Sequence, residues 1–321
     1  MINRFFSGPL LLRFLLFFAF FTLSITRCFA ITNWENTTNK SDNLYWAFSS
    51  EAALLATIPG YGSVFACSAV AITPTLALTA SHCVQEIKSA APNATLSISF
   101  YSKIFCPGFT PTSALPGLCI KKFMTEKHIY KVTSFIPKDA NSKTYTNDIS
   151  ILVNKSKAAF PRNISYPKFP GTALFNNIND SIKNSKVQVF GYTSRDKTPI
   201  SKAVATTLFD NYQKLNSKEF VGFYVSEKPN GKIGDKNTAG ICNGDSGGPA
   251  YLSLKNKLWF VGLTSNGGSQ GVGTCTWPNY STAVFAKPTL DFFQSLINSK
   301  QFDQLNSKQL DNWLKDAGSS Y

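Results

Sequence analysis

Residues 244–249 read Gly-Asp-Ser-Gly-Gly-Pro, and residues 79–83, far upstream, read Thr-Ala-Ser-His-Cys. The first stretch presents a serine, Ser246, among glycines, and the second supplies a histidine, His82. A serine hydroxyl is a poor nucleophile near neutral pH unless an adjacent general base removes its proton during the attack. The two stretches together therefore predict a nucleophilic serine with a histidine as its base.

A carboxylate that orients the histidine would complete such a catalytic group. Asp148 is the best candidate, because it directly precedes the apolar run Ile149–Val153, which is typical of a buried strand. The resulting order along the chain is His82, Asp148, Ser246.

This order decides between two folds. The sequence around Ser246 also satisfies the G-x-S-x-G pattern of the α/β-hydrolases, in which the histidine follows the serine along the chain. Both histidines of this chain, His82 and His128, precede Ser246. An α/β-hydrolase is therefore excluded, and the order is that of chymotrypsin. We interpret His128 as a strand or surface histidine, since no cysteine neighbours it.

The chain resembles the chymotrypsin/trypsin-like serine proteases. Residues 67–83 are similar to the histidine box of this family, with Ser81 where alanine is commoner, and residues 242–249 match its serine box almost residue for residue. Residues 262–267 resemble, more weakly, the segment that lines the substrate cleft, with asparagine in place of the usual tryptophan. The resemblance extends over roughly residues 60–297.

The resemblance implies an all-β fold of two six-stranded antiparallel β-barrels, with the active site in the cleft between them and a closing C-terminal helix. Short apolar runs between proline, glycine and asparagine also indicate an all-β chain; they span 64–72, 96–101, 149–153, 187–192, 220–225, 259–263 and 281–285. We expect a signal peptide in 1–30, an N-terminal segment in 31–60, the first barrel with His82 and Asp148 in 61–165, the second barrel with Ser246 in 166–298, and a helical extension in 299–321.

Apolar residues recur at helical spacing near the C-terminus. The first set is Leu290, Phe293, Leu296 and Ile297, and the second is Phe302, Leu305, Leu310, Trp313 and Leu314. We expect both helices to pack on the body of the protein rather than to bind a partner.

Residues 5–24 are almost wholly apolar, follow Arg4 and precede Ala30, which is typical of a cleaved signal peptide. An uncleaved anchor is the alternative, because the run is nearly long enough to span a bilayer.

Cleavage after Ala30 removes one of seven cysteines, Cys28, and leaves six. An even number is typical of a disulfide framework in an exported protein. The resemblance implies the pairs Cys67–Cys83 and Cys242–Cys275, which leaves Cys106 with Cys119.

The formal net charge of +14 falls to +11 when cleavage removes Arg4, Arg13 and Arg27. The lysines are spread along the chain without interleaved aromatic residues, so we expect a solvated cationic surface and no nucleic-acid partner. We expect no cofactor and no metal. The predicted product is a secreted monomer, extracellular or periplasmic, that has a protein or peptide substrate and no stable membrane association after signal cleavage.

The resemblance also implies residue roles. Ser246 attacks the scissile carbonyl, His82 transfers the proton to the leaving amine, and Asp148 orients His82. The N–H groups of Gly244 and Ser246 form the oxyanion hole. The substrate-binding residues are Gly240, Ser265, Gly267 and Asn279. Because Gly240, at the base of the specificity pocket, and Asn279 both lack a charge, we expect an uncharged residue before the scissile bond.

Asp245 matches the acid that pairs with a newly formed N-terminal amine in this family. No basic residue followed by the usual activation motif precedes Cys67, and Ile31, exposed by signal cleavage, is a poor match to that motif.

Two other function classes stay compatible with the sequence. One is a catalytically idle binding protein on a protease scaffold, and the other is a surface adhesin that binds through residues 299–321.

Overall fold

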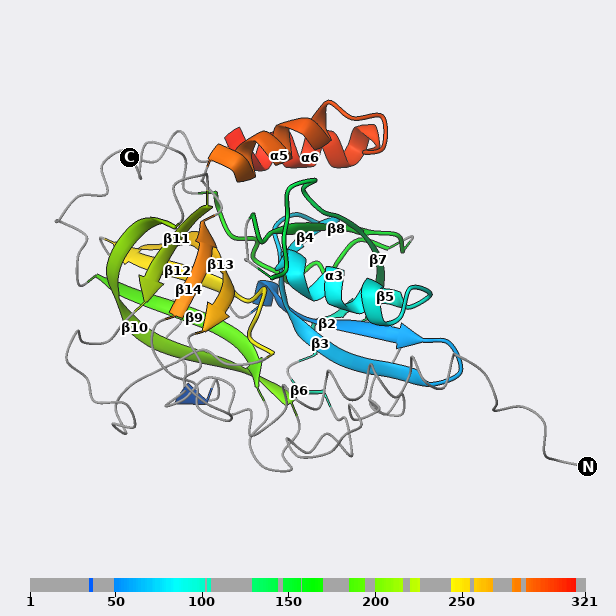
Figure 1. Ribbon diagram of the computed structural model, residues 1–321, viewed down its shortest axis with the longest axis horizontal. Helices are drawn as coiled ribbons and strands as arrows, with labels where there is room; N and C mark the ends of the chain where they lie inside the picture. The colour runs from blue at the N-terminus through cyan, green and yellow to red at the C-terminus, as the bar shows by residue number, and fades with distance from the viewer. Residues whose placement is uncertain are drawn as a thin grey trace, which may run out of the picture.

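The computed structural model describes a mostly β protein with three helices in its described residues (Figure 1). None of these helices is long and apolar enough to cross a membrane. The predicted signal peptide, Ile31, His128, Gly240 and four of the predicted disulfide cysteines, Cys106, Cys119, Cys242 and Cys275, lie outside the described residues. These residues are 35–36, 49–101, 103–104, 129–143, 147–156, 158–169, 185–193, 200–215, 220–225, 244–254, 257–267, 279–283 and 287–315.

The first unit is a closed barrel of six antiparallel strands in the order β2-β3-β4-β8-β7-β5. Figure 1 shows these strands in blue, cyan and green. The barrel contains β2 (Glu51–Ile58), β3 (Gly62–Ala71), β4 (Leu76–Thr79), β5 (Thr95–Ser99), β7 (Ile129–Phe135) and β8 (Ser150–Asn154). Strand β2 thus belongs to the barrel, although it falls within the segment predicted to precede it.

Strands β4 and β8 are buried on both faces. Successive side chains of a strand point to opposite sides, and here Ala77 and Leu152 point into the barrel core. Leu78, Ile151 and Val153 instead belong to the core shared with the second unit. The mostly apolar run Ile149–Val153 after Asp148 therefore reflects a strand enclosed between two cores.

The second unit is an eight-stranded antiparallel sheet in the order β1-β10-β11-β14-β13-β12-β9, with β6 paired to β10 and a further pairing of β9 with β10. Its strands are β1 (Glu35–Asn36), β6 (Lys103–Ile104), β9 (Lys186–Thr193), β10 (Ile200–Leu215), β11 (Phe220–Val225), β12 (Pro249–Leu254), β13 (Lys257–Gly267) and β14 (Asn279–Ala283).

The predicted all-β fold with two antiparallel units is confirmed. In the second unit six strands pair in a ring, because β10 and β9, the two ends of the path β10-β11-β14-β13-β12-β9, also pair with each other. The long strand β10 pairs in addition with the short strands β1 and β6, which brings this sheet to eight strands.

Two C-terminal helices, α5 (Lys287–Ile297) and α6 (Gln304–Lys315), pack on the body of the protein, and Figure 1 shows them in orange and red along one side. Phe293 of α5 and Leu310 and Trp313 of α6 are buried. Leu305, the second residue of α6, corrects the predicted apolar face, because its side chain is 58% exposed.

Helix α6 contacts both units through what we call the helix interface, the contacts of Phe302 and α6 with Thr75, Phe135, Pro167 and Phe260. Phe302 packs edge-on against Phe135 of β7, with ring centroids 5.5 Å apart. Trp313 lies against Phe260 of β13, and its indole N–H donates to the carbonyl of Pro167 at 2.7 Å. The Thr75 hydroxyl, next to β4, bonds to Asn306 and Gln309 of α6, at 2.5 and 2.8 Å, respectively.

Candidate active site

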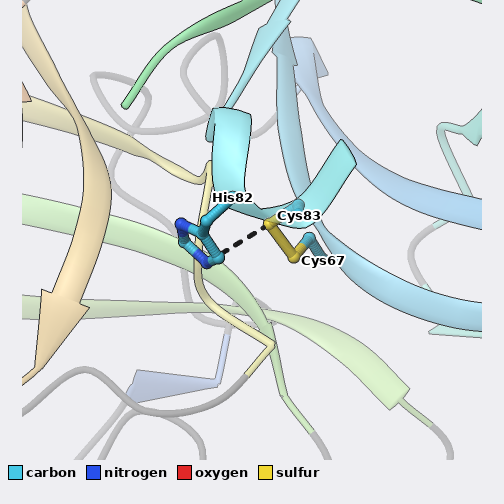
Figure 2. Close-up of side chains that lie close together, drawn as sticks. All are labelled: Cys67, His82 and Cys83. Atoms are coloured by element: carbon cyan, nitrogen blue, oxygen red, sulfur yellow. Dashed lines mark hydrogen bonds between the residues drawn. A yellow bond between two sulfur atoms is a disulfide. The ribbon is translucent and has the colours of Figure 1, made fainter. Parts of the chain in front are cut away.

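His82 occupies the second position of α3 (Ser81–Ala90), which begins immediately after β4 and Ala80. The predicted Cys67–Cys83 disulfide is present and ties the first turn of α3 to β3, with a Cα–Cα distance of 6.3 Å. Figure 2 shows the His82 ring beside this disulfide, with Nε2 3.6 Å from Cys83 Sγ. The backbone that carries His82 is therefore anchored on both sides, by β4 and by a covalent bond.

Potential ligand atoms of Cys67, His82 and Cys83 lie within 4.8 Å of one another. Metal ions bind cysteine as the thiolate, and both sulfur atoms here are joined in a disulfide. In this state the cluster is a disulfide packed on a histidine, and it does not offer the sulfur ligands of a zinc site.

Asp148 is positioned by a tight turn that leads into β8. Asn147 has a left-handed backbone, with φ of 44°, a conformation that asparagine tolerates better than most residues. Its carbonyl accepts the Ile149 N–H at 2.8 Å, and its side-chain amide donates to Asp139 at 3.0 Å. Asp139 thus supports the turn, whereas Asp148 reaches His82.

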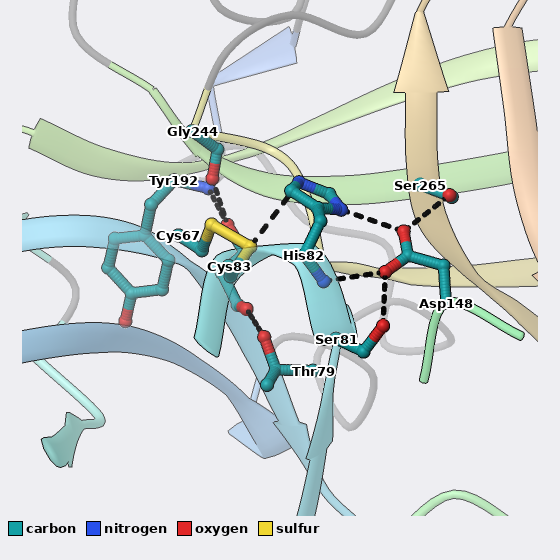
Figure 3. Close-up of a disulfide and its surroundings, with 10 residues drawn as sticks. Cys67, Thr79, Ser81, His82, Cys83, Asp148, Tyr192, Gly244 and Ser265 are labelled. Carbon is teal, nitrogen blue, oxygen red and sulfur yellow. Dashed lines mark hydrogen bonds and ion pairs between the residues drawn. A yellow bond between two sulfur atoms is a disulfide. The ribbon is translucent and has the colours of Figure 1, made fainter. Parts of the chain in front are cut away.

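The Asp148 carboxylate is fully buried and accepts four hydrogen bonds, which Figure 3 shows. Oδ2 accepts from His82 Nδ1 at 2.7 Å and from the Ser265 hydroxyl at 2.5 Å. Oδ1 accepts from the His82 backbone N–H at 2.7 Å and from the Ser81 hydroxyl at 2.9 Å. Because Nδ1 donates to the carboxylate, the lone pair of a neutral His82 ring lies on Nε2.

The electrostatics favour an ionic pair. Burial alone would lower the pKa of His82, but attraction to Asp148, their hydrogen bond and a weaker attraction to Glu86 outweigh burial and raise it. Burial likewise opposes ionisation of Asp148, but the His82 charge and the hydrogen bonds from His82 and Ser265 lower its pKa overall. The carboxylate therefore stays ionised, and the protonated imidazole is stabilised, as a general base requires.

Ser246 is half-buried, and its loop packs against the barrel just before His82. The Ser246 carbonyl accepts the Ser68 N–H at 2.8 Å. Gly247 has φ of 80°, and a Cβ there would collide with Thr79 and with the backbone of Ala80. Only glycine lets the serine loop approach this closely.

The structure brings His82 and Asp148 into direct contact. Within the part of the chain that the structure describes, no hydrogen bond joins the Ser246 hydroxyl to His82. Such a bond is often long until substrate binds.

Ser68 of β3 links the barrel to the serine loop, a role that its sequence position did not reveal. Its hydroxyl donates to the Gly244 carbonyl at 2.8 Å and accepts the Tyr192 N–H at 2.9 Å. These contacts, together with that of Ser265 with Asp148, form what we call the polar interface. A serine within an apolar strand gives no signal of a partner 176 residues away.

The predicted substrate-binding residues lie in different surroundings. Ser265 is buried and contacts Asp148. Gly267 is paired with Asn279 across β13 and β14, and the structure describes both by their backbone. Gly240 lies outside the described residues, so the specificity pocket stays a prediction.

Asp245, which precedes the serine, is fully buried. Its carboxylate packs directly on Gly191 of β9, where a Cβ would collide with it. The predicted amine of Ile31 lies outside the described residues, so this pairing also stays a prediction.

Comparison with known proteins adds an independent observation. The family model described as Trypsin matches residues 119–289, slightly more than half of the chain. No curated protein matches the chain. The matched residues include Asp148 and Ser246 but not His82, so the contact of His82 with Asp148 is evidence separate from the match.

Proposed function

The chain belongs to the trypsin family of serine proteases, and on this premise we propose that it is a secreted serine endopeptidase that cleaves peptide bonds through an acyl-enzyme. The observation that carries the proposal is the buried 2.7 Å hydrogen bond between His82 Nδ1 and Asp148 Oδ2. This bond fixes the tautomer with the proton on Nδ1, so that the lone pair on Nε2 can take a proton from serine.

In the proposed reaction, the Ser246 oxygen attacks the scissile carbonyl while His82 Nε2 takes the hydroxyl proton. The C–N bond then breaks, and His82 returns the proton to the leaving amine. Water attacks the acyl-enzyme in the second half, with His82 again as base. Asp148 stays ionised throughout, which agrees with its lowered pKa.

The backbone of the serine loop supports an oxyanion hole made by Gly244 and Ser246. The N–H groups of Gly247 and Gly248 are occupied by the carbonyls of Thr264 and Asp245. Within the described residues, those of Gly244 and Ser246 have no such acceptor. Gly244 also has a positive φ, 97°, that suits glycine. In the proposed oxyanion hole these two N–H groups would stabilise the negative charge that develops on the carbonyl oxygen.

For specificity we propose an uncharged residue before the scissile bond. The support is the absence of an acidic side chain at Gly240 and Asn279, the two positions assigned to the pocket by family resemblance. A buried lysine or arginine without a partner has a high desolvation cost. Gly240→Asp should therefore shift cleavage towards basic residues.

The packing of α6 argues against the adhesin alternative. Its apolar residues Leu310 and Trp313 are buried against the protein itself, and they are therefore not available to a partner. An idle protease scaffold normally lacks a triad residue, whereas His82, Asp148 and Ser246 are all present.

The test is cleavage of a peptide library by the purified protein, with labelling by a fluorophosphonate, a reagent that forms a P–O bond with an activated serine and releases fluoride. We expect labelling at Ser246 and cleavage after uncharged residues. A Ser246→Ala variant is the control and should show neither. A folded wild-type protein that neither reacts nor cleaves would exclude the proposed activity, and cleavage after arginine or lysine would exclude the proposed specificity alone.

A further inference from the structure

Each oxygen of the Asp148 carboxylate has two donors, and the two sets differ in origin. Oδ2 is shared between His82 Nδ1 and Ser265 of β13, across the polar interface. Oδ1 is held entirely from the start of α3, by the His82 N–H and the Ser81 hydroxyl. The carboxylate therefore cannot rotate about its axis without breaking bonds on both sides.

The Ser81 hydroxyl is well suited to this contact. Ser81 is fully buried, and it is the first residue of α3. A serine inside a helix can donate to the carbonyl one turn earlier, but no helical turn precedes Ser81. Its hydroxyl is thereby directed at Asp148 Oδ1, at 2.9 Å.

We propose that Ser81 is a positioning residue that fixes Asp148 and, by drawing part of the carboxylate charge to Oδ1, reduces the proton affinity of His82. The expected effect of Ser81 on turnover rests on the proposed protease function, whereas its expected effect on the proton affinity of His82 does not. In the described part of the chain the charged groups that face His82 are Asp148 and Glu86. Substitution of Ser81 removes neither of these two charges.

The direction of the effect follows from charge. A hydroxyl that donates to Oδ1 stabilises the carboxylate and places the positive end of its O–H dipole near the imidazole. Removal of the hydroxyl leaves more negative charge for the bond to Nδ1, and the imidazolium becomes more stable. Ser81→Ala should therefore raise the pKa of His82, although it removes a favourable contact.

The histidine content of the chain makes the test direct. The sequence has only two histidines, so a proton NMR titration of the imidazole signals resolves His82 from His128, and a His128→Ala variant assigns them. Ser81→Ala, Ser81→Thr and Ser81→Cys are compared with the wild type. Ser150→Ala is the matched control, because Ser150 is also buried, lies two residues from Asp148 and donates instead to the Phe135 carbonyl at 2.9 Å.

We expect Ser81→Ala to increase the proton affinity of His82 about threefold, a shift of about 0.5 in its pKa. Ser81→Thr, which keeps the hydroxyl, should match the wild type, and Ser81→Cys, a weaker donor, should fall between them. Ser150→Ala should leave His82 unchanged, and His128 should titrate alike in every variant. The acid limb of kcat/KM should move to higher pH by the same amount as the NMR value.

An unchanged or lowered pKa of His82 in Ser81→Ala would overturn the proposal. If Ser81→Ala does not fold, equal values in Ser81→Thr, Ser81→Cys and the wild type would overturn it as well. Because the titration needs no substrate, a wild-type protein without protease activity would refute the proposed function and leave this result standing.

Discussion

Besides their shared apolar core, the barrel and the eight-stranded sheet are joined by two sets of contacts that differ in chemistry. At the polar interface, the hydroxyls of Ser68 and Ser265 join the halves by hydrogen bonds of 2.5 to 2.9 Å. At the helix interface, Phe302 packs edge-on against Phe135, and Trp313 is buried among aromatic rings. The contacts of the polar interface are short, directional hydrogen bonds, and those of the helix interface are extended apolar packing.

This difference indicates that the two interfaces have different roles. A hydrogen bond within the protein contributes only about 1 kcal/mol net to stability, but it fixes direction. Burial of a large aromatic side chain contributes about 1.5–3 kcal/mol or more and specifies direction weakly. We therefore expect changes at the polar interface to alter reaction rates, and changes at the helix interface to alter the free energy of unfolding.

The largest expected effect is at the catalytic group itself. Ser246→Ala and His82→Ala should each reduce kcat by about 10⁶-fold, because neither nucleophile nor base has a substitute. The measurement is peptide hydrolysis, with circular dichroism as the control for folding. Near wild-type activity in either folded variant would contradict the assignment of that residue.

Asp148→Asn should reduce kcat about 10⁴-fold near neutral pH. The amide keeps the shape of the carboxylate, but it cannot hold His82 with the proton on Nδ1. Asp139→Asn is the matched control, because Asp139 bonds to Asn147 in the same turn at 3.0 Å and makes no contact with His82 within the described residues. Comparable losses in the two variants would show that the turn, and not the charge at Asp148, limits the rate.

At the helix interface, Trp313→Ala should lower the free energy of unfolding by about 3–5 kcal/mol. The change removes a buried ring in contact with Phe169 and Phe293 and the hydrogen bond to the Pro167 carbonyl. Thermal and urea denaturation measure the loss, and Leu305→Ala, at an exposed position of α6, should leave stability nearly unchanged. At low temperature, where Trp313→Ala is folded, its kcat should equal that of the wild type. A loss of kcat under these conditions would contradict the expectation that the helix interface affects stability and not reaction rate.

The sequence predicted those parts of the site that are local in the chain. Asp148 could be singled out because it directly precedes a run that folds as β8, and His82 because residues 67–83 match the histidine box of the family. In the sequence Ser81 is only a departure from the family pattern, since the acceptor of its hydroxyl is brought to it by the fold. The contact of Ser265 with Asp148 joins residues 117 positions apart, and nothing local encodes it.

Some strands also have no local signal in the sequence. Glu51–Ile58 is rich in alanine and leucine, which favour helices, yet it forms β2 because β3 and β5 pair with it on both sides. The extra strands on β10 were missed for the same reason, since pairing between distant segments overrides local propensity.

The finest test of the comparison uses one hydroxyl at each interface. Ser68→Ala removes two hydrogen bonds, to the Gly244 carbonyl and from the Tyr192 N–H, and Thr75→Ala removes the bonds of Thr75 to α6. Each change should lower the free energy of unfolding by about 1–3 kcal/mol, the usual cost of losing a buried hydrogen bond.

Kinetics should separate the two variants. Gly244 carries one of the proposed oxyanion donors, so loosening its carbonyl in Ser68→Ala should misalign that donor and lower kcat by about tenfold, less than the 10²–10³-fold loss typical of deleting a donor. KM should change little, because the hydrogen bond from the Gly244 N–H to the substrate carbonyl oxygen is weak in the ground state and strengthens in the transition state. Thr75→Ala, on the far side of β4 from the serine loop, should leave both kcat and KM unchanged. Equal kcat values in the two variants, at matched stability, would mean that Ser68 holds the halves together without directing the serine loop.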